Sequence, residues 1–195
     1  MEVSKALRRS IKVKEKLLHQ PSEIKKIVKI SDIIITALRN GGKLVLFGNG
    51  GSAADAQHIA CELISKFKFE RKGLSAIALT VNTSILTAIG NDYSFDNIFS
   101  RQVEALVNSE DVVIGISTSG KSINVIKGLK YANMLGATTI GLTGRGGGDI
   151  RKIVDICIMI PSNITPHIQE AHITVGHIIC QIVEEKICES SISRP

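Results

Sequence analysis

The stretch DVVIGISTSGKS (111–122) joins an apolar run to a loop of small polar residues, and it decides the fold. The run DVVIGIS (111–117) has the composition of a buried β-strand. The octet GISTSGKS (115–122) matches the phosphate-loop pattern G-x-x-x-x-G-K-S/T letter for letter. A buried strand that leads into such a loop and then a helix is typical of parallel α/β folds. The stretch therefore predicts an α/β protein that binds a phosphate, and it leaves open which phosphate.

Four further apolar runs of the same character predict the rest of the sheet: KLVLFG (43–48), SAIALTV (75–81), ATTIGLTG (137–144) and DICIMI (155–160). Helical patterns lie between them, from about Ser52 to Phe67, in a short piece after residue 81, and from the octet to about Gly136. A last helix is predicted from about Pro166 to Cys188. Apolar strands that alternate with helices indicate a parallel sheet covered on both faces. We expect a three-layer α/β/α sandwich with a five-stranded parallel sheet over residues 41–188.

Two extra helices are predicted before the sandwich, within residues 1–40. The first carries an apolar stripe made of Val3, Leu7, Ile11, Leu17 and Leu18. The second is expected to begin at Pro21-Ser22-Glu23, with Ser22 as its cap, and to end before Asn40-Gly41-Gly42. We expect these helices to pack on the body or on a partner subunit, and the whole chain, 1–195, to be a single domain.

Composition and charge narrow the class of protein. Hydrophobic residues make up 44% of the chain and charged residues 22%, which is enough apolar surface for a substantial core. The net charge of +6 resides in the first 30 residues, where nine Lys or Arg face three Glu. A nucleic-acid arm would explain this charge, but the apolar stripe favours a solvated helix, so we expect no nucleic-acid partner.

Membrane insertion and secretion are not expected. No apolar run approaches the ~20 residues that span a bilayer, and the amino terminus lacks the apolar stretch of a secretory signal. The cysteines form no C-x-x-C pair, which favours reduced, structural thiols: Cys61, Cys157, Cys180 and Cys188. We therefore expect a cytoplasmic protein.

Nucleotide chemistry is disfavoured by what the other strands lack. Hydrolysis of a nucleoside triphosphate needs a magnesium-binding Asp at the end of another strand, but these strands end in LTVNT, GLTGR and IMIPS. A second pattern, Gly48-x-Gly50-x-x-Ala53, fits the dinucleotide fingerprint G-x-G-x-x-G/A. Its expected acid is also missing, because the next strand ends in Val81-Asn82-Thr83.

A phosphate that is bound and left intact fits both loops. Each loop joins a strand end to a helix N-terminus, where free N–H groups and the helix dipole favour an anion. The octet itself carries four hydroxyl groups, on Ser117, Thr118, Ser119 and Ser122. Ser52, at the head of the neighbouring helix, adds a fifth. Helix capping alone would explain one of these side chains but not four. The two loops therefore predict a site for a phosphomonoester.

Two helices offer residues for chemistry. His58 and Glu62 are four apart, and so share one helix face, while Gln169 and His177 lie about two turns apart on the last helix. Together they form a plausible ligand set for a zinc-like ion. Glu62 and His177 are equally plausible as an acid/base pair without metal. His172 is expected to have a packing or interface role.

The sequence resembles the sugar isomerase (SIS) domain family, and within it the phosphoheptose isomerases. The similarity covers nearly the whole chain and rests on four blocks: GNGGSAADAQHIACEL (48–63), AIGNDYSFDNIFSRQVEAL (88–106), GISTSGKSINVIKGL (115–129) and IQEAHITVGHIICQIVE (168–184). The resemblance implies an aldose–ketose isomerisation of sedoheptulose 7-phosphate to D-glycero-D-manno-heptose 7-phosphate through an enediol. It also implies that the product supplies nucleotide-activated heptose for a surface glycan.

The resemblance further implies site residues and an assembly. Glu62 and His177 match the acid/base pair, and one Zn²⁺ per subunit is implied at His58, Glu62, Gln169 and His177. Members of the family are typically homotetramers with active sites at subunit interfaces. The substrate-binding positions implied are Asn49, Gly50, Gly51, Ser52, Glu62, Asn91, Asp92, Ser117, Thr118, Ser119, Ser122 and Gln169.

The sequence differs from the family pattern at two places, and two alternative functions are compatible with the same fold. Lys66 stands where the family often has Arg, and Pro166-His167 stands where some members have Asp-Arg. The rival is a non-catalytic SIS-domain tetramer that binds the replication initiator protein and lacks the carboxylate and imidazole found here at Glu62 and His177. A phosphosugar sensor fused to a DNA-binding module is a third reading, but no helix-turn-helix segment is evident. The pair Glu62 and His177 favours the enzyme.

Overall fold

A five-stranded parallel sheet forms the centre of the protein. The structure is a computed structural model that describes residues 2–192, and within them the sheet order is β2-β1-β3-β4-β5. The chain thus winds outward in both directions from the neighbouring strands β1 and β3, and ligands of such sheets bind at this point, beyond the carboxyl ends of the strands. The strands are β1 (Leu44–Gly48), β2 (Ala76–Ala78), β3 (Val112–Ser117), β4 (Thr138–Thr143) and β5 (Ile156–Met159).

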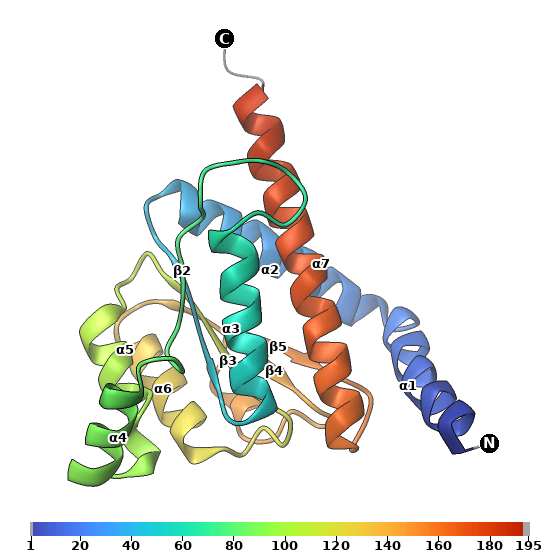
Figure 1. The fold of residues 1–195 in the computed structure, drawn as a ribbon, viewed down its shortest axis with the longest axis horizontal. Helices are drawn as coiled ribbons and strands as arrows, with labels where there is room; N and C mark the ends of the chain where they lie inside the picture. The colour runs from blue at the N-terminus through green and yellow to red at the C-terminus, as the bar shows by residue number, and fades with distance from the viewer. Residues whose placement is uncertain (1, 193–195) are drawn as a thin grey trace.

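Helices cover both faces of the sheet, which confirms the expected three-layer sandwich (Figure 1). Residues alternate between the faces, so that Leu44 and Leu46 of β1 enter one apolar core while Val45 and Phe47 enter the other. The first core also contains residues of α2 (Pro21–Arg39), α3 (Gly51–Ile64) and α7 (Thr165–Ile192). The second contains residues of α5 (Ser100–Leu106) and α6 (Ile123–Met134), with α4 (Thr83–Asp92) packed beside it.

The first helix, α1 (Glu2–Leu18), extends away from the sandwich (Figure 1). Val13 and Leu17 are its buried residues, so Leu17 is the member of the predicted stripe that packs on the body. Val3, Leu7 and Ile11 remain exposed, at 73%, 60% and 54% of their surface. An uncovered apolar stripe on a projecting helix is typical of a surface that associates with another protein chain.

Four predicted boundaries were wrong. The last helix, expected to end at about Cys188, continues to Ile192. Ser22 does not cap α2, because Pro21 is already helical and Gln20 precedes the first turn. The helix expected to reach Phe67 ends at Ile64. The second strand is shorter than expected and pairs with β1 over the three residues 76–78, as an edge strand with a neighbour on one side.

The described helices include none whose length and hydropathy would allow it to cross a bilayer.

Candidate active site at the carboxyl ends of the strands

The two loops predicted to bind phosphate lie side by side. Strand β1 pairs with β3 in parallel, with Gly48 opposite Ile116, so both strands end at the same edge of the sheet. A β-carbon on Gly48 would lie 2.8 Å from the β-carbon of Ser52, which is itself buried in the first turn of α3. The register of β1 and β3 therefore brings the glycine turn and the serine-rich octet to one place.

Hydroxyl groups of the octet converge on Ser117. Its Oγ lies 2.9 Å from Oγ of Ser122 and 3.4 Å from Oγ of Ser119. Ser117 is buried, Ser122 is partly buried and Ser119 is exposed. The Oγ of Ser122 thus contacts another hydroxyl, although Ser122 is the residue that precedes α6. A group of adjacent hydroxyls at a helix N-terminus suits an anion with several oxygen atoms.

The backbone of the octet is held by a second glycine-rich segment. The carbonyl of Gly120 accepts hydrogen bonds from the N–H groups of Asp149 and Ile150, and the N–H of Gly144 donates to the carbonyl of Thr118. Gly120 has a φ of 65°, and a β-carbon there would overlap the backbone of Gly147. The position therefore requires glycine both for its conformation and for its space.

An amide pair that the sequence analysis missed joins the two loops. The side chains of Asn49 and Asn124 donate to one another, with both N···O distances 2.9 Å. Asn49 directly follows β1, and Asn124 lies in the first turn of α6. Both residues follow strands that are neighbours in the sheet. In the sequence, the position of Asn124 just after the octet was the signal that could have indicated its place at the site. The pair fixes the spacing between the glycine turn and the octet.

A second group of side chains lies on the outer faces of α3 and α7. The Nε2 atom of His58 lies 3.0 Å from Oε1 of Glu62 and 2.9 Å from Nε2 of His177. The distance from Nε2 of His177 to Oε1 of Glu62 is 4.0 Å. The side chains of His58 and His177 are 51% and 40% exposed, and that of Glu62 is 23% exposed. The structure thus brings together the three residues that the sequence analysis drew from two distant helices.

This trio has the dimensions of a metal site. Four ligand atoms at about 2.0–2.1 Å from a tetrahedral zinc ion are about 3.3 Å from one another. The three N···N and N···O distances, 2.9, 3.0 and 4.0 Å, bracket that value. Two imidazoles and a carboxylate are also ligands that zinc prefers. In the absence of an ion, one neutral imidazole can donate to the other through the 2.9 Å contact.

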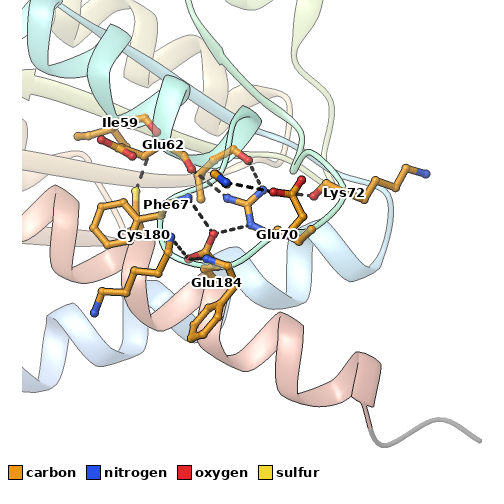
Figure 2. Close-up of polar contacts among 12 residues, drawn as sticks. Ile59, Glu62, Phe67, Glu70, Lys72, Cys180 and Glu184 are labelled. Carbon is orange, nitrogen blue, oxygen red and sulfur yellow. Dashed lines mark hydrogen bonds and ion pairs between the residues drawn. The ribbon is translucent and has the colours of Figure 1, made fainter.

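Close packing of α3 against α7 produces this geometry. Gly176 of α7 lies against Ile59 of α3, and a β-carbon on Gly176 would be 2.7 Å from Cδ1 of Ile59. One turn further along α7, the Sγ of Cys180 lies 3.9 Å from the carbonyl oxygen of Ile59 (Figure 2). Small residues at this crossing allow the helix axes to approach closely, which is what lets His177 reach His58.

Two ionisable groups, the partly buried Asp55 and the fully buried His172, lie near these elements. Burial raises the pKa of Asp55 to about 6, although the nearby His58 acts to lower it. Burial also lowers the pKa of His172 to about 4, against the effect of the hydrogen bond between its Nε2 and the carbonyl of Thr143. His172 is fully buried, which confirms the predicted packing role. Asp55 was not singled out from the sequence, since nothing in its neighbours indicates burial.

The remaining predicted residues surround the loops. Gln169, in the first turns of α7, packs so closely on Gly51 that a β-carbon on Gly51 would overlap its side-chain amide. Asn91 and Asp92 are exposed at the end of α4, where the Asn91 amide donates to the Asp92 carboxylate over 2.9 Å. Gly50, with a φ of 56°, precedes α3. Gln169 therefore lies beside the glycine turn, whereas Asn91 and Asp92 face solvent.

The loops and the trio are distinct regions of one chain. Glu62 follows Gly51 by eleven residues on α3, which corresponds to roughly 16 Å along the helix axis. The loops lie at the ends of the strands, and the trio lies further along α3 and α7.

The sequence profile of the SIS domain matches residues 10–144, which cover more than half of the chain and include both loops, His58 and Glu62. The chain belongs to the SIS domain family. This SIS domain is 56% identical over 190 residues to the phosphoheptose isomerase of Aquifex aeolicus, covering 97% of this chain and 98% of the relative. It is 59% identical to the phosphoheptose isomerase of Geotalea daltonii, over 83% of this chain and 84% of that one.

A solved structure has the same architecture as this SIS domain. The phosphoheptose isomerase GmhA from Neisseria gonorrhoeae superposes with a TM-score of 0.89 at 41% identity, covering 94% of this chain and 97% of that chain. The likeness extends through the helices outside the sheet, because so little of either chain is left out of it. Both the fold and the family expected from the sequence are thereby confirmed.

Proposed function

We propose that this protein is a phosphoheptose isomerase, which converts sedoheptulose 7-phosphate to D-glycero-D-manno-heptose 7-phosphate through an enediol or enediolate. The observation that carries the proposal is the convergence of Glu62 and His177, 4.0 Å apart, in a chain that also holds a hydroxyl-lined phosphate loop. The relative from Aquifex aeolicus, at 56% identity, is named for the same activity. The product is proposed to serve as a precursor of nucleotide-activated heptose.

The phosphate of the sugar is proposed to bind at the octet and to remain attached. Hydroxyls of Ser117, Ser119 and Ser122 and the N-terminus of α6 are donors for its oxygens. Asn49, Gly50, Gly51 and Gln169 would hold the sugar beside it. Lys121 completes the letters of the phosphate-loop pattern, but no strand-terminal Asp accompanies it to hold magnesium. The site therefore suits a phosphomonoester rather than a nucleoside triphosphate.

The isomerisation requires a proton to leave carbon next to a carbonyl and protons to move between adjacent oxygens. We assign the carbon proton to Glu62, whose carboxylate can act as a base, and the oxygen protons to His177, because an imidazole can both accept and donate a proton. The reverse assignment uses the same two residues. His58 lies within 3.0 Å of Glu62 and of His177, so it can orient both.

We further propose that the trio, with Gln169 as a fourth ligand, holds one Zn²⁺ per subunit. When bound, such an ion polarises a carbonyl and stabilises negative charge that develops on oxygen. The dimensions of the trio support this, whereas Gln169 lies eight residues from His177 on α7, roughly 12 Å along the axis. Its side chain also lies on Gly51, so substrate binding is the better supported of its two proposed roles.

A homotetramer with active sites at subunit interfaces is part of the proposal. The 51% exposed His58 would leave a reactive enediolate open to water in an isolated chain, and a neighbouring subunit would cover it. The exposed stripe of α1 offers a surface for assembly. In this proposal residues 1–40 serve assembly and residues 41–188 form the catalytic sandwich of one domain. The proposed location is the cytoplasm, where thiols such as the exposed Cys61 stay reduced.

Purified protein supplied with sedoheptulose 7-phosphate is expected to yield an aldose 7-phosphate without release of inorganic phosphate. Glu62→Gln is expected to lower kcat by about 100-fold or more, because a general base contributes about 10²–10⁴-fold. Glu104→Gln, which alters an exposed ion pair with Arg101, is the matched control and should leave kcat unchanged. Product formation is followed by NMR. An inactive wild-type protein that binds a replication initiator tightly would instead favour the regulatory alternative.

A measurement of metal content tests the zinc proposal independently of the acid/base assignment of Glu62 and His177. Protein purified without chelators is expected to carry about one zinc per chain by elemental analysis, and His58→Ala is expected to lose most of it because two of three close ligands remain. His19→Ala, at an exposed residue, is the control. Wild-type protein that turns over substrate with no bound metal would refute the ligand proposal and leave the assignment of Glu62 and His177 standing.

A further inference from the structure

The segment that follows α3 is organised by an ion pair that the catalytic proposal does not use. Arg71 and Glu184 are joined by a 2.9 Å contact between Nε and Oε1, and their side chains are 6% and 0% exposed. Removing two charges from water is costly unless their remaining donors and acceptors are satisfied. Both residues meet that condition through contacts to backbone groups around the candidate active site (Figure 2).

Arg71 caps the end of α3. Its Nη2 donates to the carbonyl of Glu62 over 2.9 Å, and its Nη1 donates to the carbonyl of Leu63 over 2.8 Å. These carbonyls belong to the last turn of the helix, where no intrahelical N–H is available to them. Arg71 is therefore bonded directly to the backbone of the residue whose carboxylate is assigned as the base.

Glu184 fixes the chain between α3 and Arg71. Its Oε1 accepts from the N–H of Phe67 over 2.9 Å, and its Oε2 accepts from the N–H groups of Lys68 over 2.7 Å and Phe69 over 3.3 Å. Burial acts to raise the pKa of Glu184, but these three N–H groups and the charge of Arg71 outweigh it, so the pKa is lowered. The carboxylate is thus held ionised in a fully buried position.

The contacts of Arg71 and Glu184 connect this ion pair to both Glu62 and His177. Glu184 lies seven residues after His177 on α7, which places both on one face of the helix. The ring of Phe67, whose N–H is bound by Glu184, lies 5.9 Å from the ring of His177 between centroids. Each end of the Arg71–Glu184 pair therefore bears on one member of the Glu62–His177 pair.

We propose that Arg71 and Glu184 act as a positioning clasp, which sets the placement of Glu62 relative to His177 for proton transfer. The inference rests on the proposed isomerase function. The clasp touches neither phosphate loop, since its partners are residues 62–72 and α7. It should therefore govern kcat and leave binding of the phosphosugar unaffected.

The test compares Glu184→Gln, Arg71→Met and Arg71→Lys with a matched buried carboxylate elsewhere. Asp111, also 0% exposed, accepts from the N–H groups of Lys43 and Asn108 and pairs with Nζ of Lys43 over 2.6 Å, at the start of β3. Asp111→Asn should destabilise the fold without affecting the clasp. Steady-state kinetics are measured where every variant is folded by circular dichroism.

Glu184→Gln and Arg71→Met are expected to lower kcat at least about 10-fold with KM within about 3-fold, because small displacements of reacting groups slow catalysis strongly. Arg71→Lys, which keeps the charge but not the planar fork, should recover part of kcat. Asp111→Asn should retain kcat. A loss of stability in Glu184→Gln equal to that of Asp111→Asn, with kcat unchanged, would overturn the proposal and leave a purely structural pair.

A second readout keeps the clasp separate from the isomerase proposal. In full-length protein with isotopically labelled histidine, the NMR signals of the His58 and His177 rings should shift in Glu184→Gln and Arg71→Met and not in Asp111→Asn. If the wild-type protein does not isomerise the sugar, the function fails, and these shifts still decide the clasp. Unchanged ring signals in both clasp variants would refute it.

Discussion

At the scale of single residues, Glu62 makes contacts through both its side-chain carboxylate and its backbone carbonyl. Its carboxylate faces His58 and His177, while its backbone carbonyl accepts from Arg71. Sequence spacing is sufficient to predict the contact between the Glu62 carboxylate and His58, because residues four apart share a helix face. The second contact depends on where a loop folds back, which no local pattern encodes.

The amide pair of Asn49 and Asn124 illustrates the same limit. Each Asn is visible in the sequence beside a glycine turn or the octet, but their meeting depends on the parallel register of β1 and β3. The partial burial of Asp55 is equally hard to predict from local sequence, because it results from packing of α3 on neighbouring elements. Residue types therefore predicted which groups are present, and tertiary register determined which of them touch.

The lowered pKa of His172 gives a prediction for stability. Because the folded-state pKa is about 4 and the ordinary value is 6.5, the unfolded chain takes up a proton first as the pH falls. The stabilisation is complete above pH 6.5 and is lost as the pH approaches 4, by at most about 3 kcal/mol. Denaturant unfolding at fixed protein concentration across this window measures it.

His172→Gln keeps a donor for the carbonyl of Thr143 and should flatten the stability profile between these pH values. Asp55, whose pKa is raised, contributes with the opposite sign but is present in both proteins, so the difference between them isolates His172. His19→Gln, at an exposed position, should keep the wild-type profile. Parallel profiles of wild type and His172→Gln would show that His172 is not the source.

At the scale of elements, the end of α3 was predicted incorrectly for an instructive reason. The sequence from Ser52 to Phe67 is compatible with a helix throughout. The helix ends at Ile64 because Arg71 takes up carbonyls of its last turn and Glu184 takes up N–H groups of the residues that follow. Glu184 is more than a hundred residues away in the chain. The alternation of strands and helices, by contrast, was predictable, because each strand carries its own apolar run.

The crossing of α3 and α7 gives a prediction at this scale. Gly176→Ala would place a β-carbon 2.7 Å from Cδ1 of Ile59, so the Ile59 side chain or the two helices must shift to make room. We expect a loss of about 1–3 kcal/mol, the usual cost of overpacking, together with a reduced kcat because His177 moves from Glu62. Urea unfolding and steady-state kinetics measure the two effects.

Ile59→Ala in the Gly176→Ala background supplies the control. The smaller residue creates room for the new methyl group, so the double variant should be more stable than the sum of the two single losses predicts. Additive losses would mean that the two positions do not share the contact described between the helices.

At the scale of the whole molecule, two surfaces of the described residues remain exposed although their side chains suit a covered environment. One is the stripe of Val3, Leu7 and Ile11 on α1, and the other is the exposed side of the trio on α3 and α7. The amphipathic pattern of α1 was predictable, but which of its residues pack on the sandwich was not, since Val13 was missed and Leu17 was included. One assembly that covers both surfaces would explain them together.

Substituting a charge into the stripe tests that assembly. Leu7→Glu is expected to lower the oligomeric mass measured by light scattering and to reduce activity together with it, because a buried unpaired carboxylate disfavours an interface. Arg9→Glu, on the opposite face of α1, is the matched control and should keep the wild-type mass. A Leu7→Glu protein with unchanged mass would exclude this stripe from the interface.

The backbone contacts around Gly120 limit how this scaffold could be re-engineered. Three hydrogen bonds, from Gly144, Asp149 and Ile150, tie the octet to its neighbouring loop. Adding a strand-terminal Asp by mutagenesis would supply a magnesium ligand but would leave these three bonds, and with them the conformation of the octet, in place. Classifying such chains by the eight letters of the octet alone would assign them to the wrong enzyme class.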